Sequence, residues 1–147
     1  MQAHFTRRVL TRLLLVPVAA LALTVGGCSS NETGPDVHTP TSAKLLVNGV
    51  DETADLLLTA GTTTRVVIKF YDDHGAEMTT IETEHFSTLT FTAAALATPV
   101  DVAGHHFQHD VSAQAAAGTG TVMVGFGHDA LADEASFGPF PVTVAVP

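Results

Sequence analysis

The chain has 147 residues, with 15 acidic and 6 basic side chains, one cysteine, one tyrosine and no tryptophan. A single cysteine cannot form an intrachain disulfide, so stability has to come from a packed core. An excess of acidic residues disfavours nucleic acid as a partner, and so few large aromatic side chains argue against a carbohydrate-binding platform.

Residues 1–27 have the three-part plan of a secretory signal peptide. The positively charged start is supplied by three arginines, Arg7, Arg8 and Arg12. Residues 9–25 are mostly apolar, but Pro17 interrupts them and the run is shorter than the ~20 residues that a membrane-spanning helix needs. The Arg7-Arg8 pair leaves both the general secretory and the twin-arginine export route open.

The leader ends on the only cysteine, in the stretch Leu-Ala-Leu-Thr-Val-Gly-Gly-Cys at residues 21–28. An apolar run and two glycines before a lone cysteine resemble the lipobox of bacterial lipoproteins. The resemblance implies cleavage before Cys28, a covalent lipid on its thiol and a place in the bacterial cell envelope. The residue after the cysteine is Ser29 and not an aspartate, which implies delivery of the lipoprotein to the outer membrane. There the domain would face the periplasm or the cell surface. Without the leader, 3 basic and 15 acidic residues remain, so we expect the lipid alone to hold the chain at the membrane.

Residues 28–42 are expected to form the lipidated end and a flexible tether, because 29–42 are polar, contain two prolines and lack an apolar period. Residues 43–147 have the size of one compact domain.

Within 43–147, apolar residues alternate with polar ones in the period of a β-strand, as at Val66, Ile68 and Phe70. Turn signals such as Asn48-Gly49 separate the alternating runs. We expect seven strands, at 43–50, 63–71, 85–92, 97–102, 106–115, 119–127 and 138–146. Many short strands in a domain of this size predict an antiparallel β-sandwich.

The segment 62–75 reads as a threonine-rich start, an alternating strand and then Asp-Asp-His-Gly. It resembles the second strand and following turn of bacterial immunoglobulin-like domains, although the cysteine pair and the core tryptophan of antibody domains are absent. The resemblance implies an all-β, immunoglobulin-like sandwich serving as a binding, interaction or structural module with an envelope protein as partner. No nucleophile elbow, phosphate-binding loop or nucleotide fingerprint is present, so no enzyme activity is expected.

Six histidines fall in or beside three predicted connections, those after the second, fourth and sixth of the seven strands. They are His74, His85, His105, His106, His109 and His128. In an immunoglobulin-like order these connections share one end of the sandwich. Imidazoles with carboxylates such as Asp129 form ligand sets for Zn²⁺, Cu²⁺ or Ni²⁺.

The alternative function is therefore a transition-metal-binding lipoprotein. It would take two ligands from 105–109, one from His128 and one from His74 or His85. The competing interpretation is that these histidines are exposed to solvent at the end of the sandwich and bind no metal. The carboxylates of 129–134 offer a weaker site for Ca²⁺.

Overall fold

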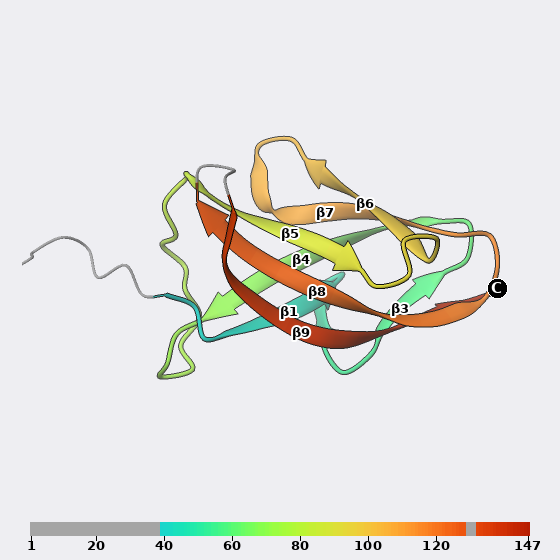
Figure 1. Ribbon diagram of the computed structural model, residues 1–147, viewed down its shortest axis with the longest axis horizontal. Coiled ribbons are helices and arrows are strands. Elements are labelled where there is room, and N and C mark those ends of the chain that lie inside the picture. Colours follow the sequence, from blue (N-terminus) through green and yellow to red (C-terminus); the bar gives the residue numbers. More distant parts are fainter. Residues whose placement is uncertain (1–38, 129–131) are drawn as a thin grey trace, which may run out of the picture. The chain divides into compact units, whose positions relative to one another are not determined.

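The computed structural model describes residues 39–128 and 132–147. The expected signal peptide, Cys28 and most of the tether lie outside the described residues. The described residues form nine strands in two sheets, which confirms the all-β sandwich (Figure 1). No helix in these ranges is long and apolar enough to cross a membrane.

Five strands form one sheet, in the order β2 (Val50–Asp51), β1 (Ser42–Val47), β4 (Thr63–Tyr71), β7 (His105–Ala113) and β6 (Ala97–Val102). Four form the other, in the order β3 (Leu56–Thr59), β9 (Ala132–Ala145), β8 (Gly118–His128) and β5 (His85–Phe91). All neighbours are antiparallel except β3 and β9, which are parallel. The seven expected strands are all present, and they divide between the sheets as in an immunoglobulin-like domain.

Two short strands, β2 and β3, were not expected. The first arises because Asn48 and Gly49 both have positive φ, 53° and 81°. These angles suit a two-residue hairpin turn, which brings Val50 back opposite Val47. β9 also begins six residues earlier than expected, at Ala132.

The core lies between the sheets, where alternate residues of each strand point inward. Val124 of β8 and Ile68 of β4 are buried on opposite sheets, as their alternation predicts, whereas Thr90 is exposed and Lys69 only half-buried. Buried valine, leucine and phenylalanine side chains make up most of the core, and burying each of them stabilises the fold by about 1.5–3 kcal/mol.

Four strands meet at one end of the sandwich: β4 and β8 reach it with their last residues, and β5 and β7 start from it (Figure 1). We call it the histidine end. The core there is aromatic: Phe70 contacts Phe107, Phe126 and Phe137 at ring-centroid distances of 5.6, 4.8 and 5.7 Å. Edge-to-face and tilted pairs of this kind add to the stabilisation from burial alone.

The described part of the tether already belongs to the domain. Pro40 is buried, and the backbone N–H of Thr41 donates a 2.8 Å hydrogen bond to the carbonyl of Tyr71. Ser42 is the first residue of β1. Residues 40–42 therefore contact the domain or form part of its first strand.

Candidate functional site

The histidine end carries the expected histidines, but the structure divides them among four places. His85 and His128 lie together, His109 is buried between the sheets, and His74 is in the β4–β5 connection. His105 and His106 are exposed at the start of β7. Asp129 lies outside the described residues. The expected combination of two ligands from 105–109 with His128 is not among the groups of close ligand atoms in the described part of the chain.

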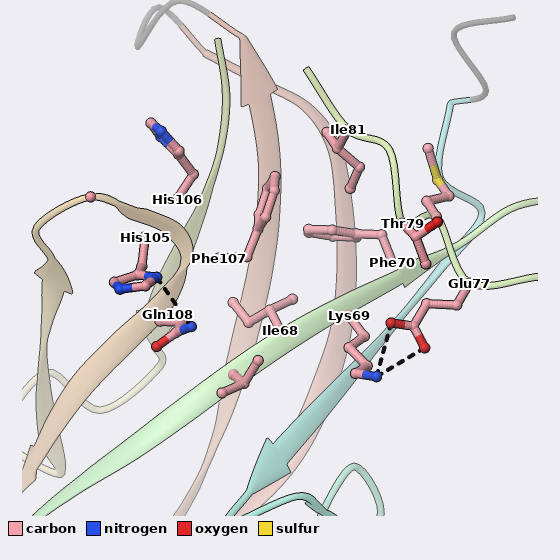
Figure 2. Close-up of a pocket in the computed structure, with 13 residues that line it drawn as sticks. Ile68, Lys69, Phe70, Glu77, Thr79, Ile81, His105, His106, Phe107 and Gln108 are labelled. Atoms are coloured by element: carbon pink, nitrogen blue, oxygen red, sulfur yellow. Dashed lines mark hydrogen bonds and ion pairs between the residues drawn. The ribbon is translucent and has the colours of Figure 1, made fainter. Parts of the chain in front are cut away.

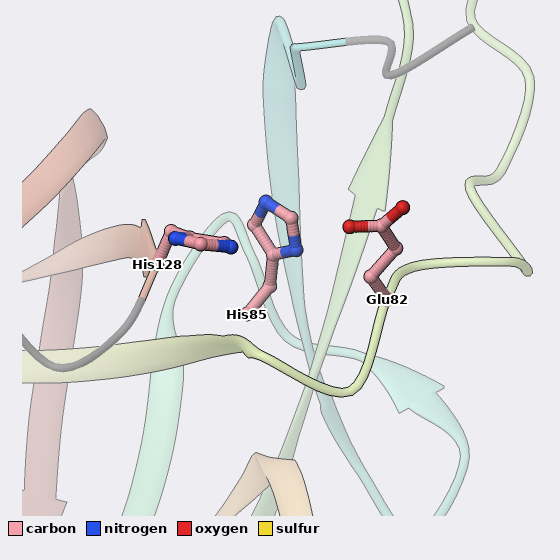
Figure 3. Close-up of side chains that lie close together, drawn as sticks. All are labelled: Glu82, His85 and His128. Atoms are coloured by element: carbon pink, nitrogen blue, oxygen red, sulfur yellow. The ribbon is translucent and has the colours of Figure 1, made fainter. Parts of the chain in front are cut away.

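His85 and His128 are directly opposite each other on the paired strands β5 and β8. Their ring centroids are 4.8 Å apart, and the His85 ring stacks on Phe126 at 4.9 Å. Glu82 approaches the same point because a turn joins it to His85, whose N–H donates a 3.1 Å hydrogen bond to the Glu82 carbonyl. In Figure 3 the His85 ring lies between the His128 ring and the Glu82 carboxylate. One ligand atom from each of the three lies within 4.8 Å of the other two.

The burial within this cluster is uneven. His85 is only 4% exposed, and its Nδ1 has neither solvent contact nor a hydrogen-bond partner among the described residues. The Nε2 atom of His128 lies 3.1 Å from a carboxylate oxygen of Glu84. Because Glu82 and Glu84 are exposed, the cluster opens to solvent on their side.

His109 occupies a different environment, in a polar connection between the two sheets. Its Nε2 is 2.9 Å from the hydroxyl of Ser87 on β5, and that hydroxyl also donates to the carbonyl of His106 at 3.0 Å. On the other side of the ring, Nδ1 lies 2.9 Å from Oδ1 of Asp101, but the two groups do not have the geometry of a hydrogen bond. Burial lowers the pKa of His109 below 6.5, and the nearby Asp101 carboxylate partly opposes this shift.

The order Ser87–His109–Asp101 is that of a hydrolase triad, with the serine at Nε2 and the carboxylate at Nδ1. Here Ser87 is 3% exposed and His109 1% exposed, so both lie inside the core. A nucleophile has to reach a substrate carbonyl, and this hydroxyl is covered by the opposite sheet. The arrangement therefore joins the sheets and does not form a catalytic site.

Asp72, Asp73 and His74 form a second group of close ligand atoms, but a local turn accounts for it. A carboxylate oxygen of Asp72 accepts the N–H groups of His74 and Ala76, both at 2.9 Å. The His74 ring contacts Asp73 at 2.7 Å, and both side chains are largely exposed. Aspartate commonly organises a turn in this way.

A groove of about 450 Å³ lies where β4 and β7 separate beyond the Val67–Gln108 pair (Figure 2). Its walls come from the end of β4, the start of β7 and residues 77–81 of the β4–β5 connection. Apolar side chains line its depth: Ile68, Phe70, Met78, Ile81 and Phe107. Polar side chains line its rim: Lys69, Glu77, Thr79, His105, His106 and Gln108.

The groove itself holds one basic and one acidic side chain, Lys69 and Glu77, but the domain around it has far more acidic than basic residues. Three ion pairs, Lys44–Asp51, Arg65–Asp110 and Lys69–Glu77, use every lysine and arginine of the described residues. The pairing with Thr53 and Lys44 lowers the pKa of Asp51 to about 2. The remaining carboxylates leave a surface that attracts cations.

Two site residues, Glu82 and Ser87, were not selected from the sequence. Glu82 is in a loop, where no periodicity predicts the direction of a side chain. Its position three residues before His85 was the one available signal. Ser87 is one of the alternate residues of β5 that face the core, as its spacing from Leu89 indicates. The sequence does not show that His109 lies opposite it.

No protein-family model matches this chain, and no curated protein matches it. Among solved structures, it is similar to domains 4 and 5 of the S-layer protein SbsC, at 15% identity and a TM-score of 0.45, over 72% of this chain and 53% of that one. It is also similar to the adhesin InvE of Yersinia pseudotuberculosis, at 18% identity and a TM-score of 0.42, over 74% of this chain and 27% of that one. This chain therefore matches only part of each of those proteins, and similarity at this level assigns no function.

Proposed function

We propose that this protein is a non-catalytic, lipid-anchored binding module of the bacterial cell envelope. Cys28 would carry the lipid, and the short tether would hold the immunoglobulin-like domain close to the membrane. Two or more acyl chains anchor a protein stably, so no membrane-binding surface is required on the domain itself. The fold alone leaves the ligand open, and the binding surface has to supply that part of the argument.

The observation that carries the proposal is the groove between β4 and β7. Its volume of about 450 Å³ is that of a typical ligand site, and its apolar floor lies beneath a polar rim. Phe107 and Ile81 would contact apolar side chains of a partner that lies along the groove.

The partner's charge follows from the excess of acidic over basic residues in the domain. Lys69 is paired with Glu77 at 2.8 Å, and no unpaired lysine or arginine surrounds the groove in the described part of the chain. An acidic surface attracts positively charged partners and speeds their association. The proposed ligand is therefore a segment of an envelope protein that carries lysine or arginine beside apolar side chains.

A peptide-binding assay on the full chain in detergent tests this proposal. Two labelled peptides of equal length would share a Leu-Phe centre, flanked by lysines in one and by glutamates in the other. We expect the lysine peptide to bind, with an affinity that falls as salt rises. Thr79→Trp, at the rim, should block binding, while Thr90→Trp, on the outer face of β5, should not. Equal binding of both peptides, or equal losses in the two variants, would contradict the proposal.

A further inference from the structure

We propose that Glu82, His85 and His128 bind a divalent transition-metal ion, Zn²⁺ being the ion that fits them best. Their ligand atoms already lie within 4.8 Å of one another. Ligands of a tetrahedral zinc ion, at about 2.0–2.2 Å from the metal, lie roughly 3.3 Å apart. Small side-chain rotations would therefore complete the site without moving a strand.

The two imidazoles are held in place by the pairing of β5 with β8. His85 and His128 occupy one register pair of β5 and β8, so their Cα positions are fixed by the sheet. Directly opposite residues on antiparallel strands have Cβ atoms about 4.5–5.5 Å apart, which suits two side chains that share one ion. Phe126 stacks on His85 at 4.9 Å and restricts the rotation of its ring.

The unpaired nitrogen of His85 is the second, independent observation. A residue that is 4% exposed has a ring Nδ1 without solvent or any hydrogen-bond partner among the described residues. Buried polar atoms almost always have a partner, and an exception calls for a bound ion or water. The His85 ring also lies between the other two side chains of the cluster (Figure 3).

Glu84 would act as a positioning residue for the site. Its carboxylate lies 3.1 Å from Nε2 of His128. A carboxylate against a nitrogen of a ligating histidine orients the ring and fixes its tautomer. The segment Glu-Thr-Glu-His, residues 82–85, would thus supply two ligands and the group that orients the third.

The choice of ion follows from the donor atoms. Two imidazoles and one carboxylate suit Zn²⁺, whereas Ca²⁺ and Mg²⁺ prefer oxygen ligands throughout. Three protein ligands leave a fourth position for water or for a group from a partner. This site keeps two of the six histidines selected from the sequence and adds Glu82, which was not selected.

Binding would tie the end of the β4–β5 connection to the end of β8. The ligands at 82 and 128 come from segments far apart in the sequence, so the ion would close a long loop. A ligand that binds only the folded state raises its stability by mass action. Zinc should therefore raise the melting temperature as well as bind.

The test is a titration of the full chain in detergent, stripped of metal, with Zn²⁺ in competition with a colorimetric chelator. We expect one Zn²⁺ per chain, no Ca²⁺ binding, and a Co²⁺ derivative whose visible spectrum is that of a four-coordinate ion. Glu82→Gln and His128→Gln should abolish the tight site, and Glu84→Gln should weaken it by about 10-fold or more. Glu82 and Glu84 are exposed, so the folding of their variants should be unaffected, as circular dichroism would verify.

The matched controls are the other histidines of the same end. His74→Gln, and the double variant His105→Gln/His106→Gln, should bind Zn²⁺ like the parent. The proposal is overturned if the parent takes up no Zn²⁺, if these controls lose as much affinity as Glu82→Gln, or if Glu82→Gln binds normally. If the peptide assay is carried out on metal-free protein, its outcome is independent of this one.

Discussion

Replacing Ser87 with alanine would test whether the polar connection between the sheets stabilises this domain. The hydroxyl of Ser87 has two partners, Nε2 of His109 at 2.9 Å and the carbonyl of His106 at 3.0 Å. Ser87 and His109 are 3% and 1% exposed, so no water can take the place of the lost hydroxyl. Ser87→Ala would leave the imidazole nitrogen buried without a partner.

The expected cost follows from that burial. An unsatisfied buried polar group destabilises a protein by about 1–3 kcal/mol. For a domain of this size, each kcal/mol lowers the melting temperature by roughly 4 °C, so the melting temperature should fall by about 4–12 °C. Urea unfolding followed by circular dichroism should show a lower midpoint with an unchanged slope.

A second serine provides the control. The hydroxyl of Ser112 makes a 2.8 Å hydrogen bond to Thr63 on the exposed face, so Ser112→Ala should change stability by less than about 0.5 kcal/mol. In Ser87→Ala/His109→Leu both partners are removed, and the double variant should recover part of the loss. If Ser87→Ala and Ser112→Ala melt at the same temperature, the inter-sheet connection does not stabilise the domain and the reasoning is wrong.

Three further predictions concern the core, the pH dependence and the anchor. Val124→Asp, which places a charge at a site that is 0% exposed, should cost several kcal/mol and prevent stable folding, whereas Thr90→Asp should melt like the parent in calorimetry. The pKa of His109 is lowered in the folded state, so the unfolded chain takes up its proton first as pH falls. Stability from this group should be complete above about pH 6.5 and decline below it, and unfolding curves of His109→Gln should show a weaker decline. Cys28→Ser should release the protein from membranes after a salt wash, and a variant that still sediments with them would contradict the lipoprotein interpretation.

The strands could be predicted because a sandwich requires one buried face on every strand. Alternation with period two therefore appears directly in the sequence, as at Val66, Ile68 and Phe70. β9 was predicted to start too late because Gly138, Pro139 and the residues around them read as a turn. The structure accommodates them because the β8–β9 register shifts between Val122 and Val124, which leaves Gly138 and Pro139 outside the regular pairs, and because β3 pairs with β9 only from Val142 onward.

The sequence by itself determined that histidines gather at one end of this domain, since the order of strands and connections is enough to place them there. Which of them meet was decided only by the tertiary structure. His85 and His128 come together through the register of two strands 43 positions apart in the chain, and register depends on the packing of the whole sheet. His109 differs from His105 and His106 because it shares the inward-facing side of β7 with Val111 and Ala113, where the opposite sheet covers its ring. Glu82 lies on a turn whose path follows from tertiary contacts, and no local pattern in the sequence encodes that path.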